Sequence, residues 1–360
     1  MVQERIIIDT DPGVDDAIAI WLALASPELD VLGITVVAGN VPLAATLPNA
    51  CNVVGVTGRT DVPIFAGASR PLIRDQVFGK YAHIGKFSAD WVPESTLSPE
   101  QEHAVDFLVR MTRQAAADNN PITICALGPL TNLALALCFH PDVARGIKQI
   151  VSMSCAFTAM GNRVPWADFN VYADPHAAEI VFSSGVPIVI MPLDMTFQAL
   201  IQTEQVDDIE RSGGAPGKAM AALLRMFDRS EVDRFGREGG PIHDATVIAW
   251  LLKPELFKSK RARVGVEVAG RTAGYAFADF YHKLGEPENA LVMREIDEQG
   301  FLGLIAERLR RYGSEKKDSS EALNGSGGAN DSLPAEPNRT NAADAGCYVG
   351  AGVCGCLSGR

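Results

Sequence analysis

Up to about residue 200, short apolar runs rich in β-branched residues alternate with stretches of helical periodicity. The expected strands are Ile6–Ile8, Val31–Val37, Val62–Phe65, Ile122–Cys125, Ile150–Met153 and Val186–Met191. The expected helices are Ala17–Ala25, Ala44–Gly55, Ala104–Ala117, Leu130–Cys138 and Pro175–Phe182. Because strands that alternate with helices form βαβ units, neighbouring strands should run parallel. The sequence therefore predicts an α/β fold with a Rossmann-like, mostly parallel central sheet flanked by helices.

The pattern changes after Leu200. Helical periodicity over residues 206–211, 218–229 and 244–252 predicts a helical cap region, and residues 301–311 predict a closing helix. Residues 262–278 read as a small antiparallel excursion. From Gly313 onward, Ser, Gly, Asn, Ala and Pro dominate without periodicity. We therefore expect residues 1–312 to form one domain and residues 313–360 to form a disordered, low-complexity tail.

Charge and composition restrict the partners. A formal net charge of −12 at pH 7 disfavours nucleic acids and anionic membranes. The chain has no apolar run long enough for a transmembrane helix, and its first residues lack the apolar core of a signal peptide. Cys51, Cys125, Cys138 and Cys155 stand among apolar neighbours, which predicts buried free thiols. Together these features favour a cytoplasmic protein that binds neither nucleic acid nor membrane.

Four carboxylates crowd the segment directly after the first expected strand, Asp9-Thr10-Asp11-Pro12-Gly13-Val14-Asp15-Asp16-Ala17. One aspartate is explained as a cap of the following helix. Four are not, because they repel one another unless a cation lies between them. Oxygen ligands of this kind favour Ca²⁺ or Mg²⁺. The segment predicts a metal site at the carboxyl end of the first strand, where α/β proteins bind ligands.

This segment resembles the N-terminal motif of the inosine-uridine-preferring nucleoside hydrolases, and five further motifs follow in that family's order. They are Thr35–Asn40, Leu127–Asn132, Asp168-Phe169-Asn170 with Asp174-Pro175, Leu193–Thr196, and Ile242–Ala245. The resemblance implies that residues 1–312 form a nucleoside hydrolase domain. Such an enzyme splits the N-glycosidic bond of purine or pyrimidine ribonucleosides into free base and ribose, in nucleoside salvage. Relatives of this kind are commonly homodimers or homotetramers.

The resemblance also implies a role for each matching residue. Ca²⁺ would be bound by Asp11, Asp16, Asp244 and the backbone carbonyl of Leu127. Asp11 would also deprotonate a Ca²⁺-bound water, and cleavage would pass through an oxocarbenium-like transition state. His243 would protonate the leaving base. The nucleoside would be bound by Asp15, Asn40, Met153, Asn162, Asp168, Asn170 and, from a loop that aligns loosely, His83.

The sequence departs from the family pattern in two places. The family usually carries Met-Gly-Gly after its fifth strand, whereas this chain has Met153-Ser154-Cys155-Ala156, which predicts a tighter or shifted pocket floor. Tyrosines that some members place before the His-Asp motif are replaced by arginines, which leaves the base preference open. Candidates for base contact are Trp166, Phe227 and Phe235, and Asp194 and Thr196 are candidates for supporting the site.

Two other functions remain as alternatives. A metal-dependent phosphatase also carries Asp-x-Asp after its first strand, but it needs a separate lysine and a distal acidic pair. That interpretation leaves Asn162, Asp168 and Asn170 unexplained. The second alternative is a relative that binds nucleoside or calcium without turnover, as a result of the change at Ser154-Cys155-Ala156. Release of phosphate, or binding without release of base, would identify these alternatives.

Overall fold

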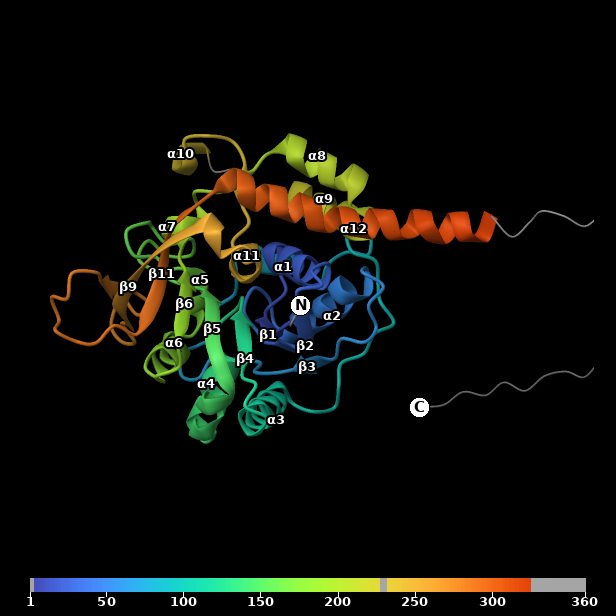
Figure 1. Ribbon diagram of the computed structural model, residues 1–360. Helices are drawn as coiled ribbons and strands as arrows, with labels where there is room; N and C mark the ends of the chain where they lie inside the picture. The colour runs from blue at the N-terminus through green and yellow to red at the C-terminus, as the bar shows by residue number, and fades with distance from the viewer. Residues whose placement is uncertain (1–2, 227–231, 325–360) are drawn as a thin grey trace, which may run out of the picture. The chain divides into compact units, whose positions relative to one another are not determined.

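A mixed sheet of nine strands forms the centre of the computed structural model, which describes residues 3–226 and 232–324 (Figure 1). In spatial order the strands are β10 (Ala276–Asp279), β9 (Phe257–Val266), β11 (Ala290–Ile296), β6 (Ile188–Met191), β5 (Ile147–Met153), β4 (Ile122–Ala126), β1 (Glu4–Thr10), β2 (Leu29–Val36) and β3 (Ile64–Ala66). From β11 to β3 all neighbours are parallel, and β9 is antiparallel to both β11 and β10. The predicted α/β class and parallel sheet are confirmed.

Helices cover both faces of the sheet, as Figure 1 shows. One face packs against α1 (Val14–Leu24), α2 (Leu43–Gly55), α9 (Gly214–Met226), α11 (Ala245–Leu252) and α12 (Glu298–Asn324). The other face packs against α3 (Ala104–Ala117), α4 (Thr131–Phe139) and α6 (Pro175–Phe182). Ile6 and Ile8 of β1 belong to the first core and Ile7 to the second, as expected for alternating side chains. In the described ranges no helix is long and apolar enough to cross a membrane.

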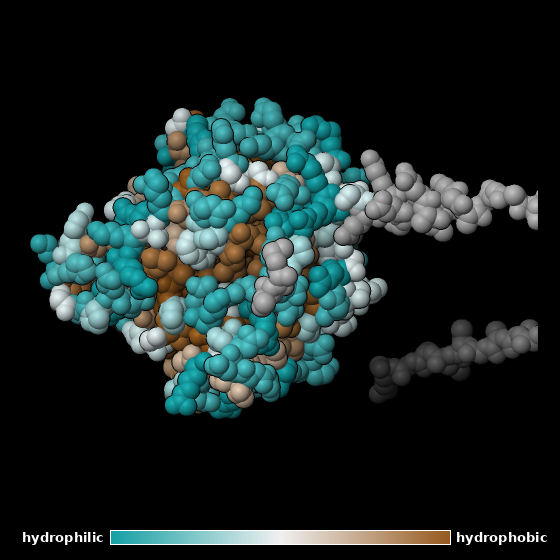
Figure 2. All heavy atoms as spheres, in the orientation of Figure 1, coloured by the Kyte–Doolittle hydropathy of each residue, from teal (hydrophilic) through white to brown (hydrophobic). Residues whose placement is uncertain are grey.

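The predicted antiparallel excursion is present after residue 257, and it extends the main sheet. β9 and β10 pair as predicted, but β11 was not predicted, and it joins them in parallel to β6. A separate two-stranded sheet is formed by β7 (Leu200–Ile201) and β8 (Gly240–Pro241). Between β7 and β8 in the sequence lie the helices of the cap region, α8 (Thr203–Ser212), α9 and α10 (Val232–Phe235). Apolar side chains gather near the middle of the face that Figure 2 shows, between hydrophilic margins.

The closing helix is longer than predicted. It was expected to end at Arg311, but α12 continues to Asn324, so the expected tail boundary at 313 falls inside a helix. Charged residues and Ala and Leu within 315–323 favour helix despite the serines around them. Tyr312 Oη donates to the carbonyl of Trp21 at 2.8 Å, which ties this helix to α1. Residues 325–360, with the rest of the predicted tail, lie outside the described ranges.

The cysteine prediction holds for three residues and is wrong for one. Cys51, Cys125 and Cys155 are buried free thiols, whereas Cys138 is exposed. The difference arises because Cys138 lies at the end of α4, on its outer side, next to Phe139, which is 72% exposed. An apolar neighbourhood in sequence therefore did not imply burial at this helix end.

Candidate active site

The N-terminal acidic motif folds as a strand, a turn and a helix. β1 ends at Thr10 and α1 begins at Val14, so Asp11 lies in the turn. Asp16 folds back over the turn: its Oδ1 accepts from Thr10 Oγ1 at 2.6 Å and its Oδ2 from the Gly13 N–H at 2.9 Å. Asp16 therefore caps α1 and lies among the other carboxylates at the same time. The capping role that explains one aspartate is real, and it belongs to Asp16.

One carboxylate oxygen of Asp11 is hydrogen-bonded, and the other has no partner among the described residues. Its Oδ2 accepts from the backbone N–H of Asn40 at 2.6 Å, which joins the ends of β1 and β2. Its Oδ1 is buried and has no hydrogen-bond partner among the described residues. A Cβ atom added at Gly39 would lie 2.1 Å from Oδ2, and one added at Gly128 would lie 2.4 Å from Oδ1. The two glycines thus form a close cradle around this carboxylate.

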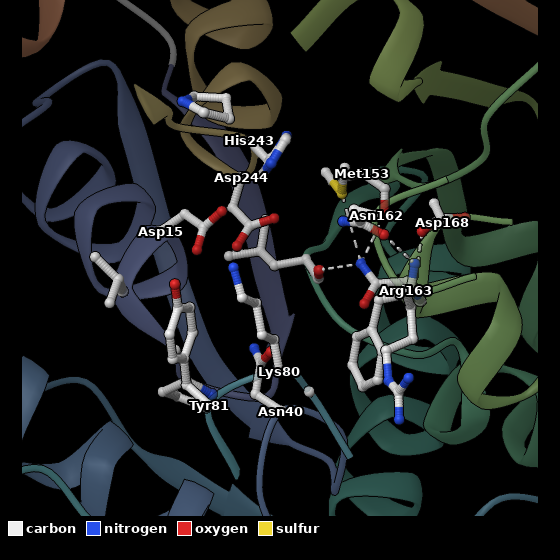
Figure 3. A pocket seen from close by; sticks show the side chains of 18 of the residues that line it. Asp15, Asn40, Lys80, Tyr81, Met153, Asn162, Arg163, Asp168, His243 and Asp244 are labelled. Carbon is white, nitrogen blue, oxygen red and sulfur yellow. Dashed lines mark hydrogen bonds between the residues drawn. The ribbon is translucent and has the colours of Figure 1, made fainter. Parts of the chain in front are cut away.

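Three more carboxylates converge beside Asp11. One ligand oxygen from each of Asp15, Asp16 and Asp244 lies within 4.8 Å of the others, and Figure 3 shows Asp15 and Asp244 pointing toward one another. Burial first, and repulsion between the carboxylates second, raise the pKa values of Asp11, Asp16 and Asp244 above their usual range. A cluster of this kind, with a buried oxygen lacking a partner, fits a hard divalent cation. Asp15, predicted for ribose, thus lies in the tightest group, beside the predicted ligands.

The remaining carboxylate of the N-terminal motif, Asp9, lies away from this cluster. Asp9 belongs to β1 and faces the α3–α4 side of the sheet, where its Oδ1 accepts from Thr35 Oγ1 at 2.6 Å and Asn132 Nδ2 at 2.8 Å. Burial raises the pKa of Asp9 to about 6, against the lowering effect of these hydrogen bonds. Asp9 does not line the cavity described below. It ties the ends of β1 and β2 to the start of α4.

A cavity of about 210 Å³ opens beside the carboxylates (Figure 3). Nine of the residues that the sequence predicted for the site line it: Asp15, Asn40, Leu127, Met153, Asn162, Asp168, Asn170, His243 and Asp244. Asp11 and Asp16 are buried next to it and bond to residues of its wall. The structure thus brings together predicted residues from distant parts of the sequence, at the carboxyl ends of β1, β2, β4 and β5.

Three predicted ribose ligands are joined to one another. Asn170 Nδ2 donates to the carbonyls of Leu127 at 2.6 Å and Met153 at 2.9 Å. Asp168 caps the short helix α5 (Phe169–Ala173), and its two oxygens accept from the N–H groups of Asn170 at 2.9 Å and Cys155 at 2.6 Å. The Oδ1 of Asn162 accepts from the first N–H of the same helix, at 2.8 Å. The Leu127 carbonyl, predicted as a metal ligand, therefore contacts one of the predicted ribose ligands, Asn170, directly.

Aromatic side chains line another part of the cavity, which we call the base side after the base contacts predicted there. Phe197, Phe235 and His243 line the cavity there, and the Phe197 ring lies 5.1 Å from Phe235 and 5.6 Å from His243 between centroids. His243 Nδ1 lies 2.7 Å from Thr196 Oγ1, so Thr196 orients the imidazole as a supporting residue. Phe227, another predicted base contact, lies outside the described residues.

Two predicted ligands are not brought to the cavity. His83 is exposed on the short 3₁₀ helix Ala82–Ile84 and does not line the cavity; its neighbours Lys80 and Tyr81 do, and Figure 3 shows both pointing inward. Trp166 does not line it either; its Nε1 donates to the carbonyl of Ala273 at 3.2 Å. Lys80 and Tyr81 were missed. The glycine before them, Gly79, is the one sequence signal, because a glycine allows two backbones to approach closely, and here its N–H donates to the carbonyl of Asn40.

The segment Ser154-Cys155-Ala156 does not form a tighter pocket floor. None of the three residues lines the cavity, and their side chains are buried. Cys155 has a φ of 77°, in the left-handed region, and its thiol packs in the core shared with α4 and α6. The backbone keeps a conformation that favours glycine, and the added side chains point away from the cavity. None of the three side chains therefore narrows the cavity directly.

Asp194 anchors the loop that leads to Asn162. Its carboxylate accepts from the N–H groups of Phe157 and Thr158, each at 2.8 Å, and of Ala159 at 3.2 Å, as well as from the Thr158 hydroxyl. Burial alone would raise the pKa of Asp194, but these hydrogen bonds outweigh it and lower the pKa below 3.8. Asp194 thus supports the site from outside the cavity.

We expect Asp194→Ala to lower the free energy of unfolding by about 2 kcal/mol at pH 7, because charged hydrogen bonds are lost. Since the folded pKa is depressed, this stabilisation is present above the unfolded value of 3.8 and is lost as the pH falls through the folded pKa. Denaturant unfolding of both proteins at pH 7 and pH 3 measures the effect. A stability difference equally large at pH 3 would contradict the assignment.

Comparison with known proteins places this sheet and site in the class of hydrolases that act on N-glycosyl compounds. The chain belongs to the inosine-uridine preferring nucleoside hydrolase family, whose model matches residues 6–303. It is 44% identical to the pyrimidine-specific ribonucleoside hydrolase RihA of Escherichia coli O7:K1 over 311 residues, which cover 85% of this chain and 98% of that protein.

Solved structures of the same class share the fold. The purine-preferring ribonucleoside hydrolase from Gardnerella vaginalis superposes with a TM-score of 0.78 at 29% identity, over 87% of this chain and 100% of that one. A plant nucleoside hydrolase superposes with a TM-score of 0.76 at 30% identity, over 85% of this chain and 99% of that one. The resemblance inferred from the six sequence motifs is confirmed.

Proposed function

We propose that this chain hydrolyses the N-glycosidic bond of ribonucleosides to free base and ribose with the help of a bound Ca²⁺. Asp11, Asp16, Asp244 and the Leu127 carbonyl would hold the ion, and Asp15 lies close enough to contribute. The observation that carries the proposal is the buried Oδ1 of Asp11, which lacks a partner among the described residues and lies beside three converging carboxylates. Ca²⁺ accepts many oxygen ligands in flexible geometry, which suits such a site better than the strict octahedron of Mg²⁺.

Different side chains of the site would carry out different parts of the reaction. When bound, Ca²⁺ would offset the repulsion of the carboxylates and make a neighbouring water more acidic. Asp11 is poised to accept the proton of the attacking water at Oδ1, while the Asn40 N–H holds Oδ2 in place. Asn40, Asn162, Asp168 and Asn170 would bind the ribose hydroxyls, and nearby carboxylates would stabilise the positive charge that develops on the sugar.

His243 would protonate the leaving base. It faces the cavity from the base side, and its contact with Thr196 fixes the orientation of the ring. We expect His243→Ala to lower kcat for uridine and inosine by about 10²-fold, the usual contribution of a general acid. Hydrolysis of 4-nitrophenyl riboside should change little, because its leaving group departs as a stable anion. An equal loss on both kinds of substrate would exclude this role.

Pyrimidine ribonucleosides are the proposed preferred substrates, because a relative 44% identical over nearly its whole length is named as pyrimidine-specific. Release of free base and ribose from nucleosides would serve salvage. The test is ribose release from uridine, cytidine, inosine, adenosine and guanosine, each with Ca²⁺ and with EDTA. Release that EDTA abolishes and Ca²⁺ restores, fastest with uridine or cytidine, is the expected result. Absence of release from all five nucleosides in Ca²⁺ would overturn the proposal.

A further inference from the structure

The loop of residues 157–163, which carries Asn162, is held from three directions. Asp194 binds its beginning through the backbone N–H groups described above. Arg163, at its end, donates from Nε to the carbonyl of Phe78 at 3.2 Å, which joins it to the loop that carries Lys80 and Tyr81. The third tie comes from the base side of the cavity, through Arg234.

Arg234 belongs to α10 and spans from the aromatic wall to this loop. Its Nη2 donates to the carbonyls of Met160 at 2.5 Å and Gly161 at 2.9 Å. Its guanidinium stacks over the Phe197 ring, 4.4 Å from the centroid, and Arg234 itself lines the cavity. One side chain therefore contacts a ring of the base-side wall and the peptide group that directly precedes Asn162.

The backbone around Gly161 is tightly packed, so it has little room to move. A Cβ atom added at Gly161 would lie 1.9 Å from the carbonyl oxygen of Ala167 and 2.2 Å from that of Val164, so the loop is tightly wound there. The Gly161 N–H donates to the Pro165 carbonyl at 3.2 Å. Asn162 follows immediately and accepts from the Phe169 N–H. A contact that fixes the Gly161 carbonyl therefore fixes the starting point of the Asn162 side chain.

We propose that Arg234 is a positioning residue that sets Asn162 for ribose binding and so couples the base side of the cavity to the ribose side. The inference rests on the proposed function, in which Asn162 contacts the sugar. A guanidinium suits this position because it is planar, stacks on aromatic rings and donates several hydrogen bonds in a fixed fork. A lysine ammonium can replace a hydrogen bond but not the stacked, forked geometry.

A double-mutant cycle on equilibrium binding tests the coupling. Binding of ribose is measured by calorimetry in saturating Ca²⁺, and KM for uridine is measured from ribose release, for the unsubstituted chain, Arg234→Ala, Asn162→Ala and the double variant. We expect Arg234→Ala to weaken ribose binding about tenfold, the value of one charged hydrogen bond. In the Asn162→Ala background the same substitution should change ribose binding less than twofold. Arg234→Lys should recover only part of the lost affinity.

Arg237→Ala is the matched control, because Arg237 lies in the same segment and bonds to Glu298 and to the carbonyl of Gln198 instead of the loop. It should leave ribose binding unchanged. An equal loss in Arg237→Ala, additive effects of Arg234→Ala and Asn162→Ala, or a rise in KM for uridine with ribose binding intact would each overturn the inference. If the unsubstituted chain neither binds ribose nor hydrolyses uridine, the proposed function fails and the inference fails with it.

Discussion

Asp11→Asn is expected to lower kcat for ribose release by about 10³-fold, within the range for loss of a general base. Asparagine keeps the size of the side chain and an oxygen that can accept from the Asn40 N–H. In place of Oδ1, which has no hydrogen-bond partner among the described residues, it puts an NH₂ group that can neither accept a proton nor bind a cation. The measurement is kcat with uridine at saturating Ca²⁺, together with the rise in Tm that Ca²⁺ produces, which should shrink in the variant.

Asp9→Asn provides the matched control for this substitution. Asp9 is a buried carboxylate two residues away, but it faces the other side of the sheet and bonds to Thr35 and Asn132. Its replacement should leave the Ca²⁺-dependent rise in Tm intact. In EDTA the Asp11 variant should be at least as stable as the unsubstituted chain, because a buried, mutually repelling charge has been removed. A full Ca²⁺ response in Asp11→Asn would contradict the proposed ion site.

Gly39→Ala is expected to lower kcat by about 10²-fold or more, although it removes no chemical group. The added Cβ atom would lie 2.1 Å from Asp11 Oδ2 and 2.8 Å from the Cδ of Pro129, so the carboxylate has to move. A displacement of about 1 Å at a catalytic group is enough for a loss of this size. Kinetics with uridine and a calcium titration followed by Tm would measure the effect on turnover and on ion binding separately.

Gly303→Ala is the control for an added methyl group. Gly303 lies on α12, far along the chain, and a Cβ atom there meets nothing within 4 Å. Because alanine favours helix over glycine, this variant should be more stable by up to about 1 kcal/mol, with unchanged activity. Normal activity and normal calcium binding in Gly39→Ala would show that the residues around Asp11 can move to make room for a methyl group. The close packing of Gly39 against Asp11 would then not be required for turnover or for ion binding.

The sequence was most informative where local pattern and structure coincide. The strands from β1 to β6 and the acidic motif are encoded by apolar runs and by residues that follow them directly, so their positions could be predicted. β11 was not predicted, because its apolar run ends at Met293, where Arg294 and Glu295 follow, and its partners, β6 and β9, are distant in sequence. The division between Asp9 and Asp11 also escaped prediction, since it depends on which side chain of β1 faces which layer of helices.

Loop residues of the site were predicted only where the family motif covered them. Asp168 and Asn170 lie in such a motif, whereas Asn162 was assigned from the resemblance although none of the six motifs contains it; the hydrogen bonds through α5 explain why the three lie together. His83 was wrongly expected in the cavity, and Lys80, Tyr81 and Arg234 were not assigned to it. The direction of such side chains depends on tertiary contacts of loops, which leave no periodic signal in the sequence.

The two halves of the cavity differ in how freely they can evolve. The acidic end is built on strand ends, with Asp11 enclosed by Gly39 and Gly128 so closely that even a methyl group is not accommodated. The aromatic end is built from α10 and neighbouring loops, whose outer side chains tolerate replacement. Under the proposed mechanism, replacement of Phe197 or Phe235 would alter the contacts of the base and leave the carboxylates in place. His243 and Arg234 lie at the same end but have proposed roles in the chemistry and in ribose binding, so they are expected to vary less.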